Sequence, residues 1–363
     1  MCKIGIFGSV GYNIGDEAIA VAAARSLLEI DSKLEVYIST LKKGVIEGKY
    51  DGLKEFYLNR SGASGWKNLF EHIKGLDIII LGGGTMIQDK LGISLIRGMI
   101  PYMYQLTIIA KFLKKPVLTL PIGVDKLNTS RGEKMAKKLL KNIDSLLVRD
   151  ENSGEYASKY SLDKAEPCIS ADPAFFLKYE PKSKKNEKYI TISLVNENLD
   201  KKAFLPAIHE TIEWLLVNTS YNIYLVPMDR RDEEELTLFK DLLKAIKNEK
   251  VQIVDPNLNV YEISDVLRNS ELLIGMRLHA MILSLGFTNI IGISRTTKTE
   301  TLLEEFNLPY FDINKKNIKG KDLIEVVEKL IGRDEIFNNI VISEKMESKS
   351  QLYYKSIQKL KII

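Results

Sequence analysis

Short runs of aliphatic and β-branched residues alternate with longer segments of helical period along the first half of the chain. Residues 16–30, for example, space their apolar side chains for one helix face and follow the strand-like run 2–10. This alternation predicts a parallel sheet with helices on both faces. The expected strands lie within 2–10, 34–40, 76–84, 115–124, 144–150 and 168–177.

The same alternation returns after a polar segment, residues 178–188, which contains Pro181 and predicts a linker. We therefore expect an α/β protein with two doubly wound, Rossmann-like domains that face each other across a cleft, one over residues 1–180 and one over 181–363. The expected strands of the second domain lie within 189–195, 221–228, 251–256, 271–276 and 289–294.

The C-terminal stretch from about residue 322 to 360 predicts helices rich in lysine and glutamate. Its apolar stripe would pack on either domain. The residues of this stripe are Tyr353, Tyr354, Ile357 and Leu360.

Length and composition fit this division. A chain of 363 residues is long enough for two domains, and 45% hydrophobic with 28% charged residues is typical of globular proteins. A net charge of +4 is too diffuse to indicate nucleic-acid binding. Cys2 and Cys168 lie in or beside apolar runs and are expected to be reduced and structural.

The apolar segments do not predict export or membrane insertion. The N-terminal residues MCKIGIFGSV lack the long apolar core of a signal peptide. The longest apolar stretch, 93–113, is interrupted by Arg97, Pro101 and Lys111, so a buried helix pair is expected there. These features predict a cytoplasmic protein.

Two glycine-rich turns end strands of the first domain. Gly8, Gly11 and Gly15 precede a helix expected to start near Asp16, which would cap it. Their spacing differs from G-x-G-x-x-G, and Ser39 and Thr40 stand where a ribose-binding carboxylate would follow. The turn therefore either contacts a ligand or closes a tight strand-to-helix connection.

The second glycine cluster, Gly82 to Gly84, follows a strand directly. Open α/β sheets bind ligands at the carboxyl ends of their strands, so two such loops on one edge suggest a cleft. Glycine triplets are also common as purely structural breaks.

Arg277 and His279 interrupt the apolar segment ELLIGMRLHAMILSLG of the second domain. Burying a guanidinium without an anionic partner is costly, so Arg277 is expected at a cleft or in an ion pair. His279 is a candidate functional histidine because it lies two residues from that arginine, whereas His72 and His209 lie in polar or mixed helical segments.

Further basic residues follow strands in both domains. Arg149 stands at the end of the expected strand in SLLVRDENSGEY and either lines the cleft or pairs with Asp150 or Glu151. Arg295 and Lys298, with nearby hydroxyls such as Ser294 and Thr296, either line a phosphate site or begin a helix.

Taken in order, the segments GYNIGDEA, LGGGTMIQD, VRDENS, SADPAF and GMRLHAMILSLG form a recognisable set. From Gly8 to Leu303 the sequence resembles the polysaccharide pyruvyl transferases. That resemblance implies the two-domain fold of GT-B glycosyltransferases, with the first domain on the acceptor side. It also implies transfer of a pyruvyl group from phosphoenolpyruvate to two hydroxyls of a sugar, which forms a cyclic ketal.

The resemblance also assigns roles to residues. Arg277 and His279 match its R-x-H motif and Arg149 its VRD arginine, so the arginines would bind the donor and His279 would be the general acid. Planar guanidinium groups suit a phosphate and a carboxylate, and histidine supplies a proton near neutral pH. The remaining expected substrate-binding residues are Gly11, Asn13, Asp16, Gly83, Gly84 and Lys298.

The sequence departs from the family where many members have a Tyr-Asp-Pro-Lys run. Here that stretch reads SRTTKTE, which keeps Lys298 and loses the aromatic and acidic positions. A glycosyltransferase that uses a nucleotide sugar, with Glu300, Glu304 and Glu305 as donor contacts, therefore stays open. So does a catalytically idle protein that binds an anionic metabolite.

The expected partners follow from the resemblance. They are phosphoenolpyruvate and a sugar or lipid-linked glycan acceptor of a cell-surface polysaccharide, with no nucleic acid, metal or cofactor. A lipid-linked acceptor would draw the protein to the inner face of the membrane through basic or apolar patches. Homo-oligomerisation is left open by the sequence.

Overall fold

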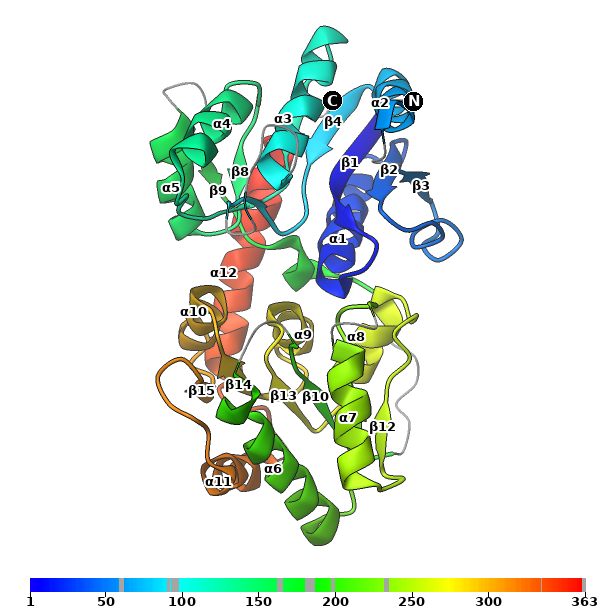
Figure 1. Cartoon of the computed structure of the whole chain (residues 1–363). Coiled ribbons are helices and arrows are strands. Elements are labelled where there is room, and N and C mark those ends of the chain that lie inside the picture. Colours follow the sequence, from blue (N-terminus) through cyan, green and yellow to red (C-terminus); the bar gives the residue numbers. More distant parts are fainter. Residues whose placement is uncertain are drawn as a thin grey trace. The chain divides into compact units, whose positions relative to one another are not determined.

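The computed structural model divides the chain into two compact units (Figure 1). Unit 1 comprises Met1–Lys178 and Ser348–Ile363, and unit 2 comprises Tyr179–Glu347. Most of the expected linker, residues 180–186, lies outside the described residues. The structure describes residues 1–58, 62–89, 92, 98–161, 166–179, 187–196, 200–231, 235–333 and 335–360.

Unit 1 is built on a five-stranded sheet with the order β3-β2-β1-β4-β6. All its strand pairs are parallel, and β1 lies between β2 and β4 with Phe7 opposite Leu81. This order reverses direction between β1 and β4, as in one half of a Rossmann fold. The strands are β1 (Lys3–Val10), β2 (Glu35–Thr40), β3 (Leu53–Tyr57), β4 (Ile78–Leu81) and β6 (Val117–Thr119).

Two short strand pairs continue the chain beyond this sheet. β5 (Thr85–Ile87) pairs with β7 (Gly123–Val124), and β8 (Leu147–Val148) pairs with β9 (Cys168–Ile169). A parallel bridge joins Ile122 to Val148. These pairs bring the segments after β4, β6 and β8 next to one another.

Helices cover both faces of the unit 1 sheet. Buried residues of α2, α3, α4 and α5 form one core cluster with Phe7, Ile79 and Leu81, and α1 packs on β1 outside that cluster. Right-handed crossovers place α1 and α3 on opposite faces because the strand order reverses between them. The helices are α1 (Ile14–Ile30), α2 (Gly62–Lys74), α3 (Met99–Phe112), α4 (Ser130–Leu140) and α5 (Glu151–Ser161).

Helix α3 occupies the apolar stretch for which a buried helix pair was expected. Pro101 lies in its first turn, where no backbone N–H is needed, so proline does not break the helix. The end of this helix is exposed on one side, because Ile108 is 47% and Phe112 is 76% exposed while Ala110 is buried. The earlier part of that stretch, residues 93–97, lies outside the described chain. None of the helices in the described parts of the chain has the length and apolar character needed to span a bilayer.

The end of the chain belongs to unit 1, whereas the sequence prediction included it in the second domain. Helix α12 (Asn339–Gln358) starts in unit 2 and ends in unit 1. The Tyr353 ring stacks on Phe176 at a centroid distance of 4.7 Å, and the Ser356 hydroxyl lies 2.6 Å from that of Ser170. The buried stripe of Tyr353 and Ile357 therefore completes the core of unit 1.

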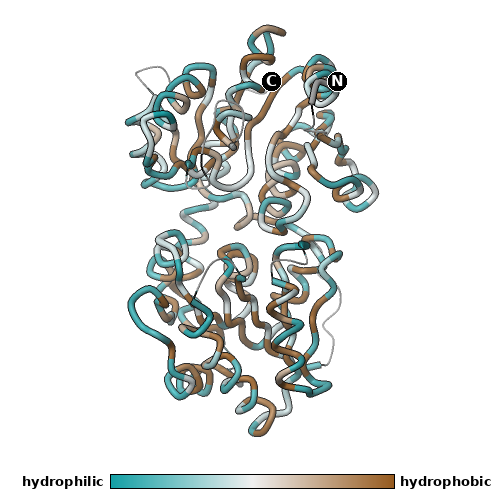
Figure 2. Tube along the Cα trace, in the orientation of Figure 1, coloured by the Kyte–Doolittle hydropathy of each residue, from teal (hydrophilic) through white to brown (hydrophobic). Residues whose placement is uncertain are grey.

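Unit 2 contains a six-stranded parallel sheet with the order β12-β11-β10-β13-β14-β15. Numbered from the first strand of the unit, this is the 3-2-1-4-5-6 order of a complete Rossmann fold. The strands of both sheets are mostly hydrophobic (Figure 2). The unit 2 strands are β10 (Tyr189–Ser193), β11 (Asn222–Leu225), β12 (Val251–Ile253), β13 (Leu272–Gly275), β14 (Asn289–Ser294) and β15 (Tyr310–Asp312).

Helices also cover both faces of the unit 2 sheet. Buried residues of α6, α7 and α11 form one cluster with the sheet. Met281 of α9 and Leu303 of α10 pack over the glycines Gly275 and Gly292 of the strands, where a Cβ would collide with them. The helices are α6 (Leu205–Asn218), α7 (Thr237–Ile246), α8 (Val260–Arg268), α9 (Leu278–Ser284), α10 (Thr297–Glu305) and α11 (Gly320–Leu330).

The loop after β2 is fixed by one carboxylate, that of Glu55 in β3. It accepts hydrogen bonds from the backbone N–H groups of Gly44, Val45, Ile46 and Glu47 at 2.8 to 3.3 Å. Partial burial raises the pKa of Glu55, but these donors outweigh it and the net pKa is lowered. The start of this loop lies close to Gly11, where a Cβ would be 3.1 Å from the backbone nitrogen of Lys42.

We expect Glu55→Ala to destabilise unit 1 by about 2 kcal/mol at pH 7, because it leaves N–H groups of the buried Val45 and Ile46 without acceptors. A lowered folded-state pKa stabilises the protein above the unfolded pKa, so the loss should shrink as the pH falls toward 3. Urea unfolding at several pH values measures both effects. Glu71→Ala, an exposed change on α2, should stay within about 0.5 kcal/mol.

Candidate functional site

The two glycine-rich loops of unit 1 meet at the carboxyl ends of β1 and β4. The Gly82 N–H donates to the Phe7 carbonyl at 2.9 Å, and a Cβ at Gly8 would lie 2.3 Å from the Gly82 oxygen. Gly83 and Gly84 have φ of +97° and +69°, values that L side chains rarely adopt. The loops therefore need glycine for close backbone approach, at the point where the strand order reverses and α/β sheets bind ligands.

Asn13, and not Asp16 as expected, caps the helix that follows the first loop. Its side-chain oxygen accepts from the Gly15 N–H at 2.7 Å, and α1 begins at Ile14. Asp16 lies in the first turn instead, with its Oδ1 only 2.9 Å from where a Cβ at Gly84 would stand. A carboxylate of α1 thus lies against the second glycine loop.

Arg149 lies at the same edge of unit 1, directly after β8. Its Nη2 donates to the Thr85 hydroxyl at 3.3 Å and its Nε to Asp150 at 3.2 Å. Nη1 lies 3.7 Å from the buried Asp172 carboxylate, and the guanidinium passes over Gly123. The ion pair with Asp150 therefore exists, and it holds a nearly buried guanidinium beside the segment that follows Gly84.

In unit 2 the corresponding point of strand reversal lies between β10 and β13. Met276 and Arg277 follow β13, and the Met276 N–H donates to the Ser193 carbonyl at the end of β10 at 2.7 Å. Arg277 precedes α9, and His279 lies half-buried in its first turn. The R-x-H motif thus stands where a Rossmann-like sheet binds its ligand.

The anionic partner expected for Arg277 is Glu235, which sequence reasoning did not identify. The Arg277 Nε donates to Glu235 Oε1, and the Glu235 side chain is fully buried. Its other oxygen accepts the Met228 N–H at 2.5 Å and the Asp229 N–H at 3.3 Å. Burial raises the pKa of Glu235 to about 7, against the opposing effects of Arg277 and the Met228 N–H.

A second carboxylate and guanidinium support this pair. Asp229, 1% exposed, accepts bidentate hydrogen bonds from Arg231 at 2.8 and 2.5 Å. Its pKa is lowered because the contact with Arg231 outweighs desolvation. Asp229 and Arg231 belong to the segment PMDRRDEEE, which by composition resembles a solvated charge run. The only sequence signal for this cluster was therefore the need of Arg277 for an anionic partner.

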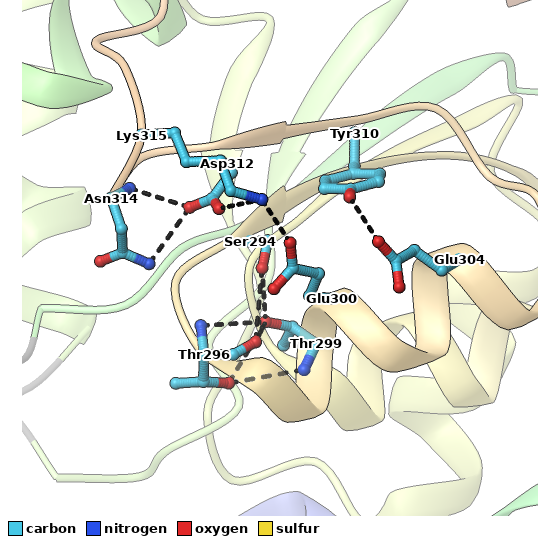
Figure 3. Close-up of polar contacts among 9 residues, drawn as sticks. All are labelled: Ser294, Thr296, Thr299, Glu300, Glu304, Tyr310, Asp312, Asn314 and Lys315. Carbon is cyan, nitrogen blue, oxygen red and sulfur yellow. Dashed lines mark hydrogen bonds and ion pairs between the residues drawn. The ribbon is translucent and has the colours of Figure 1, made fainter.

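Lys298 lies half-buried in the first turn of α10. The hydroxyls around it close the start of that helix: Thr299 bonds to Thr296 in a capping box, and the Ser294 hydroxyl lies 3.2 Å from that of Thr299 (Figure 3). Of the two alternatives for these hydroxyls, helix initiation is therefore the one observed. They place residue Lys298 in the turn that follows the carboxyl end of β14.

Glu300 and Glu304, both proposed as nucleotide-sugar contacts, pair with residues of the protein. Glu300 binds Lys315 at 2.6 Å, and Glu304 accepts from the Tyr310 hydroxyl at 3.1 Å (Figure 3). Lys315 also pairs with Asp312 at 3.1 Å. A pocket of about 290 Å³ opens beside these groups, lined by Tyr310, Phe311, Asp312, Lys315, Lys316, Asn317, Ile318 and Asp322.

The expected site residues thus fall into two sets at equivalent sheet edges. Gly11, Asn13, Asp16, Gly83, Gly84 and Arg149 belong to unit 1, whereas Arg277, His279 and Lys298 belong to unit 2. The other two histidines have structural surroundings: His72 stacks on Phe56, and His209 lies 3.5 Å from Glu213. Within the described ranges, no three His, Cys, Asp or Glu side chains form a group suited to a metal ion.

Comparison with known proteins gives a match at the family level. A model of the family described as polysaccharide pyruvyl transferase matches residues 13–288, more than half of the chain. The amylovoran biosynthesis protein AmsJ of Erwinia amylovora is 22% identical over 280 residues. That alignment covers 70% of this chain and 65% of AmsJ, just under two thirds of its length.

Solved structures resemble this chain over nearly its whole length. The Staphylococcus aureus MnaA–UDP complex matches with a TM-score of 0.64 and 13% identity, over 99% of this chain and 95% of that one. The UDP-GlcNAc 2-epimerase from Neisseria meningitidis has a TM-score of 0.60 and 13% identity, over 97% and 100%. A glycosyltransferase from Rickettsia africae has a TM-score of 0.57 and 13% identity, over 99% and 96%. These likenesses confirm the expected GT-B-type fold of two Rossmann-like domains.

Proposed function

Because this chain belongs to the polysaccharide pyruvyl transferase family, we propose that it transfers a pyruvyl group from phosphoenolpyruvate to two hydroxyls of a sugar. The acceptor is a sugar of a cell-surface polysaccharide precursor, carried on a lipid while the glycan is assembled. The name of the Erwinia relative, which connects that protein with amylovoran biosynthesis, supports such an acceptor.

The single observation that carries this proposal is the position of Arg277 and His279. They lie two residues apart, directly after β13, at the strand reversal of a Rossmann-like sheet. A fixed guanidinium recognises the phosphate or carboxylate of phosphoenolpyruvate, and imidazole is the side chain most often used as a general acid. Arg149 is the anion-binding arginine that we assign to unit 1.

The proposed reaction needs one proton transfer to carbon. His279 protonates the CH₂ carbon of the enol, which becomes a methyl group and leaves positive charge at C2. One sugar hydroxyl attacks C2, and a second replaces the phosphate. Two C–O bonds form and one breaks, while one hydroxyl proton restores His279 and the other leaves with the phosphate.

Incubation of the purified protein with phosphoenolpyruvate and a panel of sugars and lipid-linked glycans tests this function. We expect release of inorganic phosphate that depends on the acceptor, together with a product heavier by one pyruvyl ketal in mass spectrometry. Protein that binds phosphoenolpyruvate but yields no ketal with any acceptor would instead be the idle metabolite-binding protein.

Calorimetric measurement of ligand binding distinguishes our proposal from the nucleotide-sugar glycosyltransferase. A glycosyltransferase would bind a nucleoside diphosphate tightly and phosphoenolpyruvate weakly, whereas our proposal requires the reverse. The partners of Glu300 and Glu304 disfavour the alternative, because Lys315 and Tyr310 already occupy the carboxylates expected to hold a ribose.

A further inference from the structure

The buried carboxylate under Arg277 has no role in the reaction described above. Glu235 lies 42 positions before Arg277 in the sequence and reaches it from the segment that follows β11. We propose that Glu235 is a positioning residue that holds the Arg277 guanidinium for the donor anion. This inference rests on the proposed function, because phosphoenolpyruvate is the donor that Arg277 would bind.

The geometry fits positioning better than simple charge compensation. The Arg277 side chain is 13% exposed while that of Glu235 is fully buried, so the carboxylate supports the guanidinium from the protein side. Glu235 contacts Nε, the nitrogen nearest the aliphatic part of the side chain. A contact there fixes the plane of the guanidinium, and the two terminal nitrogens form the edge that binds anions bidentately.

Glu235 is itself held by the segment that follows β11. The Met228 and Asp229 N–H groups both donate to its Oε2, which leaves Oε1 directed at Arg277. Asp229 is fixed in turn by the bidentate contact with Arg231. The segment after β11 therefore determines where Arg277 lies, although the arginine follows β13.

The charged groups around Glu235 have opposing effects on its titration. Arg277 favours the carboxylate, while burial and the nearby Asp229 favour the neutral acid. The carboxylate makes the stronger, charge-assisted hydrogen bond to Nε. The positioning effect should therefore be largest above pH 7, where Glu235 is ionised.

Glu235→Gln tests the inference, because it keeps the size of the side chain and removes its charge. We expect the KM for phosphoenolpyruvate to rise ~10-fold or more at pH 8, with kcat changed less than ~3-fold, since a misplaced guanidinium weakens binding. The ratio of variant to wild-type KM should approach one as the pH falls below 7. Glu235→Asp, which keeps the charge, should recover part of the affinity.

Glu262→Gln is the matched control for a structural carboxylate of the same unit. Glu262 accepts from the Asn259 N–H at 2.9 Å in the capping box of α8, and glutamine keeps an acceptor there, so the change should alter stability little and leave KM unchanged. A Glu235→Gln protein that melts like the wild type and keeps its KM at pH 8 would overturn the inference. Wild-type protein that shows no calorimetric binding of phosphoenolpyruvate would instead refute the proposed function.

Discussion

Replacing His279 with alanine is expected to lower turnover with phosphoenolpyruvate by ~10²-fold or more, because the enol carbon loses its proton donor. The half-buried ring lies in the first turn of α9, so its removal should leave the fold intact. Steady-state phosphate release under saturating donor and acceptor measures the change. Binding of phosphoenolpyruvate should change little, because the arginines supply the affinity.

The control for this change is His209→Ala. That ring lies on α6 near Glu213 and is expected to leave kcat unaltered. Equal turnover in His279→Ala and the wild type would remove this residue from the role of acid.

Replacing Arg277 with alanine is expected to weaken binding of phosphoenolpyruvate by ~10²-fold, the value of a bidentate, charge-assisted contact. It should also destabilise unit 2 by about 3 kcal/mol, because Glu235 stays buried without its cation. Calorimetry gives the first effect. Urea unfolding followed by Trp214 fluorescence in a Trp66→Phe background gives the second, since Trp214 lies on α6 of unit 2.

Two further variants separate these effects. In Arg277→Ala/Glu235→Gln the buried charge is gone, so stability should recover while donor binding stays weak. Arg333→Ala removes an exposed arginine of the same unit, whose Nε bonds to the Lys329 carbonyl, and should change neither quantity. Normal donor binding by Arg277→Ala would show that the anion site lies elsewhere.

The two-domain organisation and most strands could be predicted from the sequence, but the edge strands β3 and β15 could not. β1, β4, β10 and β13 are mostly apolar and are buried over most or all of their length, because helices cover both faces. β3 and β15 lie at sheet edges, and their residues are partly exposed, with polar side chains such as Lys54 and Asp312. Such short runs resemble loops until the neighbouring strand is known.

For the candidate site, Arg277 and His279 could be identified from the sequence more readily than the carboxylate that contacts the arginine. Arg277 and His279 stand out because polar groups interrupt an apolar run, and the sequence also indicated that this arginine needs an anion. The identity of that anion depended on tertiary structure, because Glu235 is adjacent to acidic residues that look alike in sequence. The capping of α1 by Asn13 was also not predicted, because it depends on the exact start of the helix.

Because Ser348–Ile363 belong to unit 1, the two units can fold in an unusual order during synthesis. Domains usually fold as they emerge, the N-terminal one first. Here Tyr353 and Ser356, which contact Phe176 and Ser170, are synthesised only after the whole of unit 2. Unit 2 can therefore finish folding before the last part of α12 is available to pack on unit 1.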